Sequence, residues 1–207
     1  MKKSPILFLA IILFANTINA QLKAVKYSDG AQSLNGLFAK SAKKSNQNPG
    51  ILLLPAWLGI DKASKEIAEN LSKLGYNVFI ADIYGEGNYP TNTAEAGKQA
   101  GYYKKNYEIY QKRINAALQE LIKSGANADN IVAIGYCFGG TGVLEAARGH
   151  LKLKGVASFH GGLGKDTSRA VEPISAKVLV CHGADDPFES KEEITAFQQE
   201  MRDSKAD

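Results

Sequence analysis

The stretch "IVAIGYCFGG" (131–140) joins an apolar run to a cysteine set between glycines. The run 131–134 is typical of a strand that is buried on both faces of a sheet. Gly135, Cys137 and Gly139 follow as G-x-C-x-G, the pattern of a nucleophile elbow. Such glycines let a strand turn sharply into a helix while the central side chain projects above the sheet. The helix N-terminus behind Cys137 would favour its thiolate.

Two other interpretations fit parts of this stretch. A dinucleotide fingerprint, G-x-G-x-x-G, would need glycine at position 137 and does not fit. A buried structural cysteine stays open, because free cysteine is among the most buried residue types. The strand–turn–helix context favours a nucleophile.

The rest of the chain alternates between strand and helix patterns. Strands are predicted at 22–28, 34–40, 50–56, 76–82, 130–135, 153–159 and 176–181, the first two as a hairpin. Helices are predicted at 61–75, 106–124 and 140–150, with another starting near Ser190 and a short one at 93–100 inside a long loop, 83–105. This order predicts an α/β fold, a mostly parallel sheet with helices on both faces. In such sheets chemistry lies at the carboxyl ends of the strands.

The first twenty residues, "MKKSPILFLAIILFANTINA", have the charged, apolar and small-residue order of a signal peptide. Their apolar run, Ile6 to Ala15, is shorter than the roughly 20 residues that span a bilayer. We therefore expect export to the periplasm or the medium, no stable membrane insertion, and one mature domain over 21–207.

Composition limits the partners of this domain. The formal net charge is +4, and it is +2 once Lys2 and Lys3 leave with the signal peptide. So small a charge argues against nucleic acid and anionic membrane surfaces as partners. The two cysteines, Cys137 and Cys181, follow separate buried-looking strands, and no disulfide between them is expected.

A nucleophile of this kind needs an acid further along the chain. The segment "KVLVCHGADDPF" (177–188) offers Asp185 and Asp186 after a strand. Asp186, which precedes a proline, is the preferred candidate, and Asp185 is the alternative. A turn or helix-capping carboxylate is the competing interpretation of either residue.

Together these motifs resemble the dienelactone hydrolase family. These are cofactor-free α/β-hydrolases that cleave activated esters and lactones with a Cys-Asp-His triad. The resemblance implies that Cys137 is the nucleophile and Asp186 the acid, with an oxyanion hole from the N–H groups of Phe138 and Trp57. Four segments carry it: "GYCFGG" (135–140), "LPAWLGID" (54–61), "ADIYGEG" (81–87) and "HGADDPF" (182–188).

The chain departs from the family pattern at two places. Ala56 stands where the family commonly has a glutamate that contacts the thiol. The triad order also requires a histidine after Asp186, and the sequence shows only His150, His160 and His182. The resemblance thus implies a sequence that stops before a last helix and strand; a protein whose histidine is lost or replaced is the alternative.

All three histidines precede Asp186, so the triad order does not make any of them the base. His160, in "SFHGG", is expected to contact substrate or the oxyanion region, with a structural role equally open. His182 is expected to pack in a loop. His150 ends a helix, where it meets the helix dipole favourably.

Substrate contacts are predicted from loops at the same end of the sheet. Four aromatic residues could form an apolar wall there: Trp57, Tyr84, Tyr102 and Tyr103. Lys104 or Lys105 could meet a substrate carboxylate, as a basic residue does in the family; a solvated lysine pair is the alternative.

The predicted function is hydrolysis of small esters or lactones through a thioester on Cys137, with no metal or other cofactor. Two alternatives stay open. One is a non-catalytic exported binding protein on a hydrolase fold. The other is a thiol redox sensor.

Overall fold

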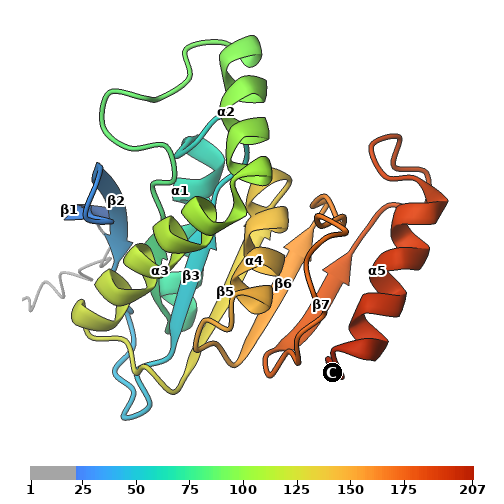
Figure 1. The fold of residues 1–207 in the computed structure, drawn as a ribbon. Helices are drawn as coiled ribbons and strands as arrows, with labels where there is room; N and C mark the ends of the chain where they lie inside the picture. The colour runs from blue at the N-terminus through green and yellow to red at the C-terminus, as the bar shows by residue number, and fades with distance from the viewer. Residues whose placement is uncertain (1–21) are drawn as a thin grey trace, which may run out of the picture.

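The computed structural model describes residues 22–207, so the predicted signal peptide lies outside the described residues. Residues 22–207 form a seven-stranded sheet in the order β1-β2-β4-β3-β5-β6-β7 (Figure 1). The strands are β1 (Leu22–Ser28), β2 (Ser33–Ala39), β3 (Gly50–Leu54), β4 (Asn77–Ile80), β5 (Ile131–Tyr136), β6 (Gly155–Phe159) and β7 (Lys177–Cys181). The helices are α1 (Lys62–Leu74), α2 (Thr93–Lys105), α3 (Tyr107–Lys123), α4 (Phe138–Arg148) and α5 (Lys191–Asp203).

The sheet is parallel from β4 to β7 and antiparallel at its other edge. Strand β3 pairs in parallel with β4 and β5, and the parallel order continues through β6 to β7. The predicted hairpin is present as β1 and β2. Strand β2 then runs antiparallel beside β4, a pairing that the sequence pattern did not indicate. The predicted α/β architecture is confirmed.

Central strand β3 shows why the sheet must be covered on both faces. All five of its residues are buried. Ile51 and Leu53 pack with Ala68 of α1 on one face. Leu52 and Leu54 pack on the opposite face with residues of α3 and α4, because successive side chains of a strand point to opposite sides.

Two helices differ from the sequence expectation. The expected short helix in the loop 83–105 is the full helix α2, because Ala96, Ala100 and Tyr103 recur at helical spacing and are buried. In α1, Leu74 falls at helical spacing after Ile67 and Leu71 and would be expected on their apolar face, yet it is 62% exposed. The helix ends there because Gly75 takes a left-handed conformation, φ 118°.

Within residues 22–207, no helix is long and apolar enough to cross a membrane.

Candidate active site

Cys137 sits in the sharp turn that joins β5 to α4, as the sequence predicts. Its backbone has a positive φ, with φ 53° and ψ −113°, which is uncommon for residues other than glycine. A Cβ atom on Gly135 would lie 2.0 Å from the Gly139 carbonyl oxygen, and one on Gly139 would lie 2.1 Å from the Leu54 carbonyl oxygen. Only glycine fits either place. The Cys137 N–H donates to the Phe159 carbonyl at 2.9 Å, which ties the turn to β6.

The two predicted oxyanion donors adjoin this turn, one at the start of α4 and one in the loop after β3. Phe138 is the first residue of α4, so its N–H has no acceptor inside the helix. Trp57 lies in the turn after β3, and its N–H has no hydrogen-bond acceptor among residues 22–207. Because Gly139 packs against the Leu54 and Pro55 carbonyls, the first turn of α4 lies beside the loop that carries Trp57. This arrangement can supply two N–H groups near the nucleophile.

Tyr84, expected in the substrate wall, has a different place. Its side chain is 1% exposed, and its hydroxyl donates to the Trp57 carbonyl at 2.6 Å. Burial raises the pKa of Tyr84, so the phenol stays protonated and can keep donating. Its ring stacks on Phe138 with centroids 5.7 Å apart. Tyr84 therefore holds both loops of the oxyanion region and does not form a substrate wall.

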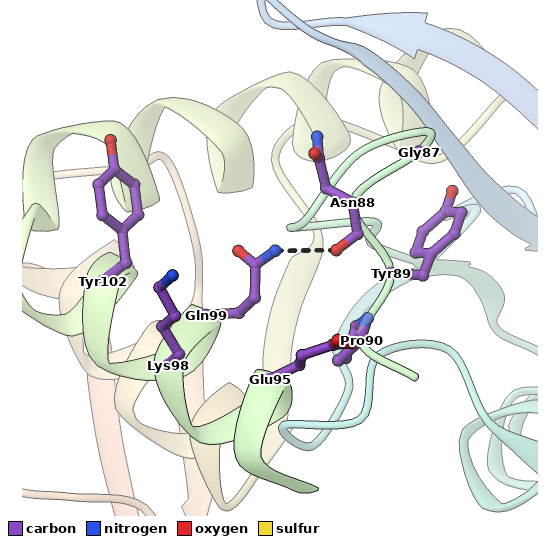
Figure 2. Close-up of a pocket in the computed structure, with 8 residues that line it drawn as sticks. All are labelled: Gly87, Asn88, Tyr89, Pro90, Glu95, Lys98, Gln99 and Tyr102. Carbon is purple, nitrogen blue, oxygen red and sulfur yellow. Dashed lines mark hydrogen bonds between the residues drawn. The ribbon is translucent and has the colours of Figure 1, made fainter. Parts of the chain in front are cut away.

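Tyr103 and Tyr102 also differ from the expected wall. Tyr103 is buried in the core. Tyr102 lines a hollow of about 430 Å³ between α2 and the loop 87–90. Figure 2 shows Gln99 in this hollow, donating to the Asn88 carbonyl. Gly97, which faces Trp57, lies on the opposite side of α2, and neither Trp57 nor Cys137 lines the hollow.

Asp186 is bound by a backbone N–H and by an imidazole. Its Oδ1 accepts the Phe188 N–H at 3.0 Å, and its Oδ2 lies 2.6 Å from His160 Nδ1. The Asp186 side chain is 3% exposed, whereas that of His160 is 54% exposed. The Phe188 N–H lowers the pKa of Asp186 below its ordinary value; burial opposes this, and His160 adds to the lowering. Asp186 is therefore the ionised member of an acid–histidine pair.

Asp185, the alternative acid, is exposed, and no side-chain hydrogen bond involves it within the described chain. His182 is packed in the loop as expected. Its Nδ1 lies 3.8 Å from Asp186 Oδ2, and both of its ring nitrogens are buried without a hydrogen-bond partner in residues 22–207. The structure thus brings Asp186 together with His160 and, less closely, with His182.

Lys104 reaches the loop that follows β6. A Cβ atom on Gly162 would lie 3.2 Å from Lys104 Nζ, 3.3 Å from Glu189 Oε1 and 3.1 Å from Thr141 Oγ1. Thr141 Oγ1 is buried and has no hydrogen-bond partner in the part of the chain that is described. An ammonium group and a free hydroxyl therefore meet at Gly162, close to the first turn of α4.

Sequence reasoning missed the bond from His160 to Asp186 and the positions of Thr141 and Glu189 at Gly162. The bond from His160 to Asp186 joins the loops that follow two different strands. In the sequence, it was indicated only by the position of His160 directly after a strand. Thr141 lies four residues after Cys137, a spacing that places it within the first turn of α4. Both cysteines are free thiols. Over the described residues, no cluster of three or more His, Cys, Asp or Glu residues could hold a metal ion.

Comparison with known proteins places this geometry in a family. The model of the dienelactone hydrolase family matches residues 34–207. A solved structure named m3DLH has a TM-score of 0.84 at 31% identity, over 90% of this chain and 78% of that one. A dienelactone hydrolase-like promiscuous phosphotriesterase, P91, from metagenomic libraries gives 0.84 at 34% identity over the same shares.

A curated relative from Bradyrhizobium sp. is named "Probable 2-oxo-3-(5-oxofuran-2-ylidene)propanoate lactonase". It is 26% identical over 164 residues, and the chain spans 66% of that relative's length. The family match covers most of the chain, and it includes the elbow, the Trp57 loop and the Asp186 loop. The chain belongs to the dienelactone hydrolase family.

Proposed function

We propose that the protein hydrolyses small esters or lactones by acyl transfer to Cys137. One observation carries the proposal: a cysteine with a positive φ at the N-terminus of α4, beside two backbone N–H groups that have no acceptor among the described residues. A strained conformation at the start of a helix is where an elbow nucleophile belongs. Phe138 and Trp57 then stabilise the oxyanion of the tetrahedral intermediate.

The reaction has two steps. The sulfur of Cys137 attacks the substrate carbonyl carbon, and the bond to the leaving alcohol or enol breaks to give a thioester. Water then attacks the thioester carbon, which releases the acid and regenerates the thiol. Asp186 acts by holding a histidine that carries protons between sulfur, leaving group and water. No metal or organic cofactor takes part in these steps.

The substrate is a small lactone or ester that carries a carboxylate. The lactone named for the curated relative is a propanoate, and Lys104 Nζ with Thr141 Oγ1 offers a cation and a hydroxyl at Gly162, beside a Glu189 carboxylate whose Oε2 accepts the Leu163 N–H. An ammonium group and a hydroxyl suit a carboxylate by charge and by hydrogen bonding. We further propose that the protein acts after export, in the periplasm or outside the cell, on a free small molecule.

The test compares the two cysteines. Purified wild-type protein should hydrolyse p-nitrophenyl acetate, and Cys137→Ala should remove that activity. Cys181→Ala is the matched control, because Cys181 is a free and exposed thiol on β7; it should keep wild-type turnover. Rapid quenching followed by mass spectrometry should find one acetyl group on Cys137.

Other results would favour the alternative functions. Unchanged turnover in Cys137→Ala would refute the assignment of the nucleophile. A sulfenic acid trapped at Cys137 by peroxide, with no ester hydrolysis, would indicate a thiol redox sensor. Saturable binding of a lactone without turnover would indicate a binding protein on a hydrolase fold.

A further inference from the structure

Each of the two candidate oxyanion donors has its carbonyl bound by a buried phenol. The Tyr84 hydroxyl donates to the Trp57 carbonyl at 2.6 Å, and the Tyr110 hydroxyl donates to the Phe138 carbonyl at 2.9 Å. Tyr84 lies in the loop after β4, whereas Tyr110 belongs to α3. Both tyrosines are buried in the core. The two donors are therefore held by two separate parts of the chain.

The aromatic rings of the two tyrosines meet on Phe138. The Phe138 ring stacks on Tyr110 with centroids 4.7 Å apart and on Tyr84 with centroids 5.7 Å apart. The angles between the ring planes are 5° and 14°, and nearly parallel rings at such separations are a favoured arrangement. The side chain of Phe138 is thus fixed by the same residues that bind the two carbonyls.

A glycine leaves the space that the Tyr110 hydroxyl occupies. A Cβ atom on Gly142 would lie 2.3 Å from that hydroxyl oxygen. Gly142 is four residues after Phe138 in α4, so its N–H faces the Phe138 carbonyl within the helix. A carbonyl oxygen has two lone pairs, and the phenol is a second donor to it. The first turn of α4 is therefore held from α3 as well as by its own backbone.

Both phenols stay protonated beside the nucleophile. Burial is the largest cause that raises the pKa of Tyr84 and of Tyr110, and the charge of a Cys137 thiolate raises both further. Each hydroxyl therefore keeps its proton when the sulfur is ionised. A neutral phenol can go on donating to a carbonyl throughout the reaction.

We propose that Tyr84 and Tyr110 are positioning residues for the oxyanion hole, Tyr84 for the Trp57 N–H and Tyr110 for the Phe138 N–H. The proposal rests on the hydrolase function proposed above and deepens it. Neither phenol touches the substrate. Each holds a donor residue through its carbonyl, so that the N–H is in place before the oxyanion forms. Formation and hydrolysis of the thioester both pass through such an oxyanion, so both steps depend on this arrangement.

The decisive variants are Tyr84→Phe and Tyr110→Phe, with Tyr103→Phe as their matched control. Tyr103 is buried in the same cluster, with ring centroids 5.8 Å from Tyr84 and 5.9 Å from Tyr110. Its hydroxyl makes no hydrogen bond to any residue in 22–207. All three changes keep the ring and remove one oxygen.

The first measurement is steady-state hydrolysis of p-nitrophenyl acetate by variants whose folding is confirmed by circular dichroism. Loss of a whole oxyanion donor costs about 10²–10³-fold in kcat, so loss of its support should cost about 10–100-fold. KM should change little, because the oxyanion is absent from the bound ester. Tyr103→Phe should match wild type in both constants.

The second measurement separates the oxyanion from the thiol. In a Cys181→Ser background, alkylation of Cys137 by iodoacetamide displaces iodide and forms no oxyanion. Its rate should be the same in wild type, Tyr84→Phe and Tyr110→Phe. A general distortion of the elbow would change this rate together with kcat.

The third measurement follows one donor without turnover. The chain has a single tryptophan, so labelling with [¹⁵N]tryptophan gives one backbone amide signal, that of Trp57. Tyr84→Phe should shift this signal in the ¹H–¹⁵N spectrum, because the bond to the Trp57 carbonyl is lost. Tyr103→Phe should leave it close to its wild-type position.

The outcomes separate this proposal from the function on which it rests. If Tyr84→Phe and Tyr110→Phe keep the wild-type kcat while Cys137→Ala removes turnover, the positioning role is overturned and the hydrolase function stands. An equal loss in Tyr103→Phe also overturns it, since the effect is then one of packing. If wild type shows no Cys137-dependent hydrolysis, the hydrolase function fails. The Trp57 amide then decides: a shift in Tyr84→Phe alone supports the positioning role, and an unmoved signal overturns it.

Discussion

Asp82 and Asp186 each follow a parallel strand at the carboxyl end of the sheet, yet their carboxylates face different donors. Asp82 Oδ1 accepts from Gly85 N–H, and Oδ2 accepts from Asn35 N–H and the Tyr89 hydroxyl, all within 2.9 Å. These donors do not titrate near neutral pH. Asp186 accepts hydrogen bonds from one backbone N–H and from an exposed imidazole.

The difference separates an acid that shapes a loop from the acid that we propose serves the chemistry. The backbone of Asp82 is bound as well: Tyr27 donates to its carbonyl and accepts from its N–H. The bonds from Tyr27 and Asn35 thus link the hairpin to the start of the loop after β4, and those from Gly85 and Tyr89 hold the loop itself. Within residues 22–207, the side chain that hydrogen-bonds to Asp186 is that of His160, whose two ring nitrogens can donate and accept a proton.

The largest expected contrast is in turnover. Asp186→Asn should lower kcat/KM for p-nitrophenyl acetate by about 10³–10⁴-fold, because an amide no longer holds the imidazole in the required tautomer. Asp82→Asn should leave the turnover of folded protein close to wild type. Steady-state kinetics on both variants, with circular dichroism to confirm folding, make the comparison. Equal losses would mean that Asp82 also serves the chemistry.

The second contrast, in stability, runs the other way. Asp82→Asn places an amide NH₂ against the donors of Gly85 or Asn35, and an unmatched buried donor costs about 1–3 kcal/mol. For a domain of this size, that should lower Tm by several degrees, at about 2–4 °C per kcal/mol. Asp186→Asn should lower it less. Thermal unfolding at neutral pH measures both, and the reverse order would refute the structural role of Asp82.

The smallest contrast appears as the pH falls. The folded-state pKa of Asp186 lies below its ordinary value, so folded protein binds fewer protons here than unfolded protein. The stabilisation from Asp186 is therefore complete above about pH 4 and is lost as the pH falls through the lowered pKa. The Tm gap between wild type and Asp186→Asn should be constant at neutral pH and close in acid.

Asp185→Asn is the control for this pH series, because Asp185 is the exposed neighbour. Its melting curve should follow that of wild type throughout. If the Tm difference between wild type and Asp186→Asn stayed the same down to pH 3, the ionised Asp186 carboxylate would stabilise the folded protein no more than the protonated one.

Much of the fold could be predicted because each strand carries its own signal. The apolar run in β3 and the glycines around Cys137 require little tertiary information, and the structure has both as expected. The pairing of β2 with β4 could not be predicted, since hydrophobic pattern alone does not select the neighbour of a strand. The full length of α2 was hidden by its glycines and polar residues.

The candidate site was predictable where backbone determines it and not where side chains meet. The turn places Cys137 and Phe138 through local geometry. The prediction for Tyr84 was wrong because the sequence shows that Tyr84 follows a strand, at the carboxyl end of the sheet. It does not show whether the side chain points into the core. The bond from His160 to Asp186 spans 26 residues and depends on how two loops fold over β6 and β7.

The crowding at the elbow also has a consequence for the order of folding. Gly139 is packed on the Leu54 carbonyl, and the Cys137 N–H is held by the Phe159 carbonyl, so β3, β5 and β6 must be assembled before the turn is held in place. These partners are far apart in the chain, and contacts of high sequence separation form slowly. A chain that has not closed its central sheet should therefore carry an ordinary thiol. Reactivity of Cys137 would then report the completion of folding.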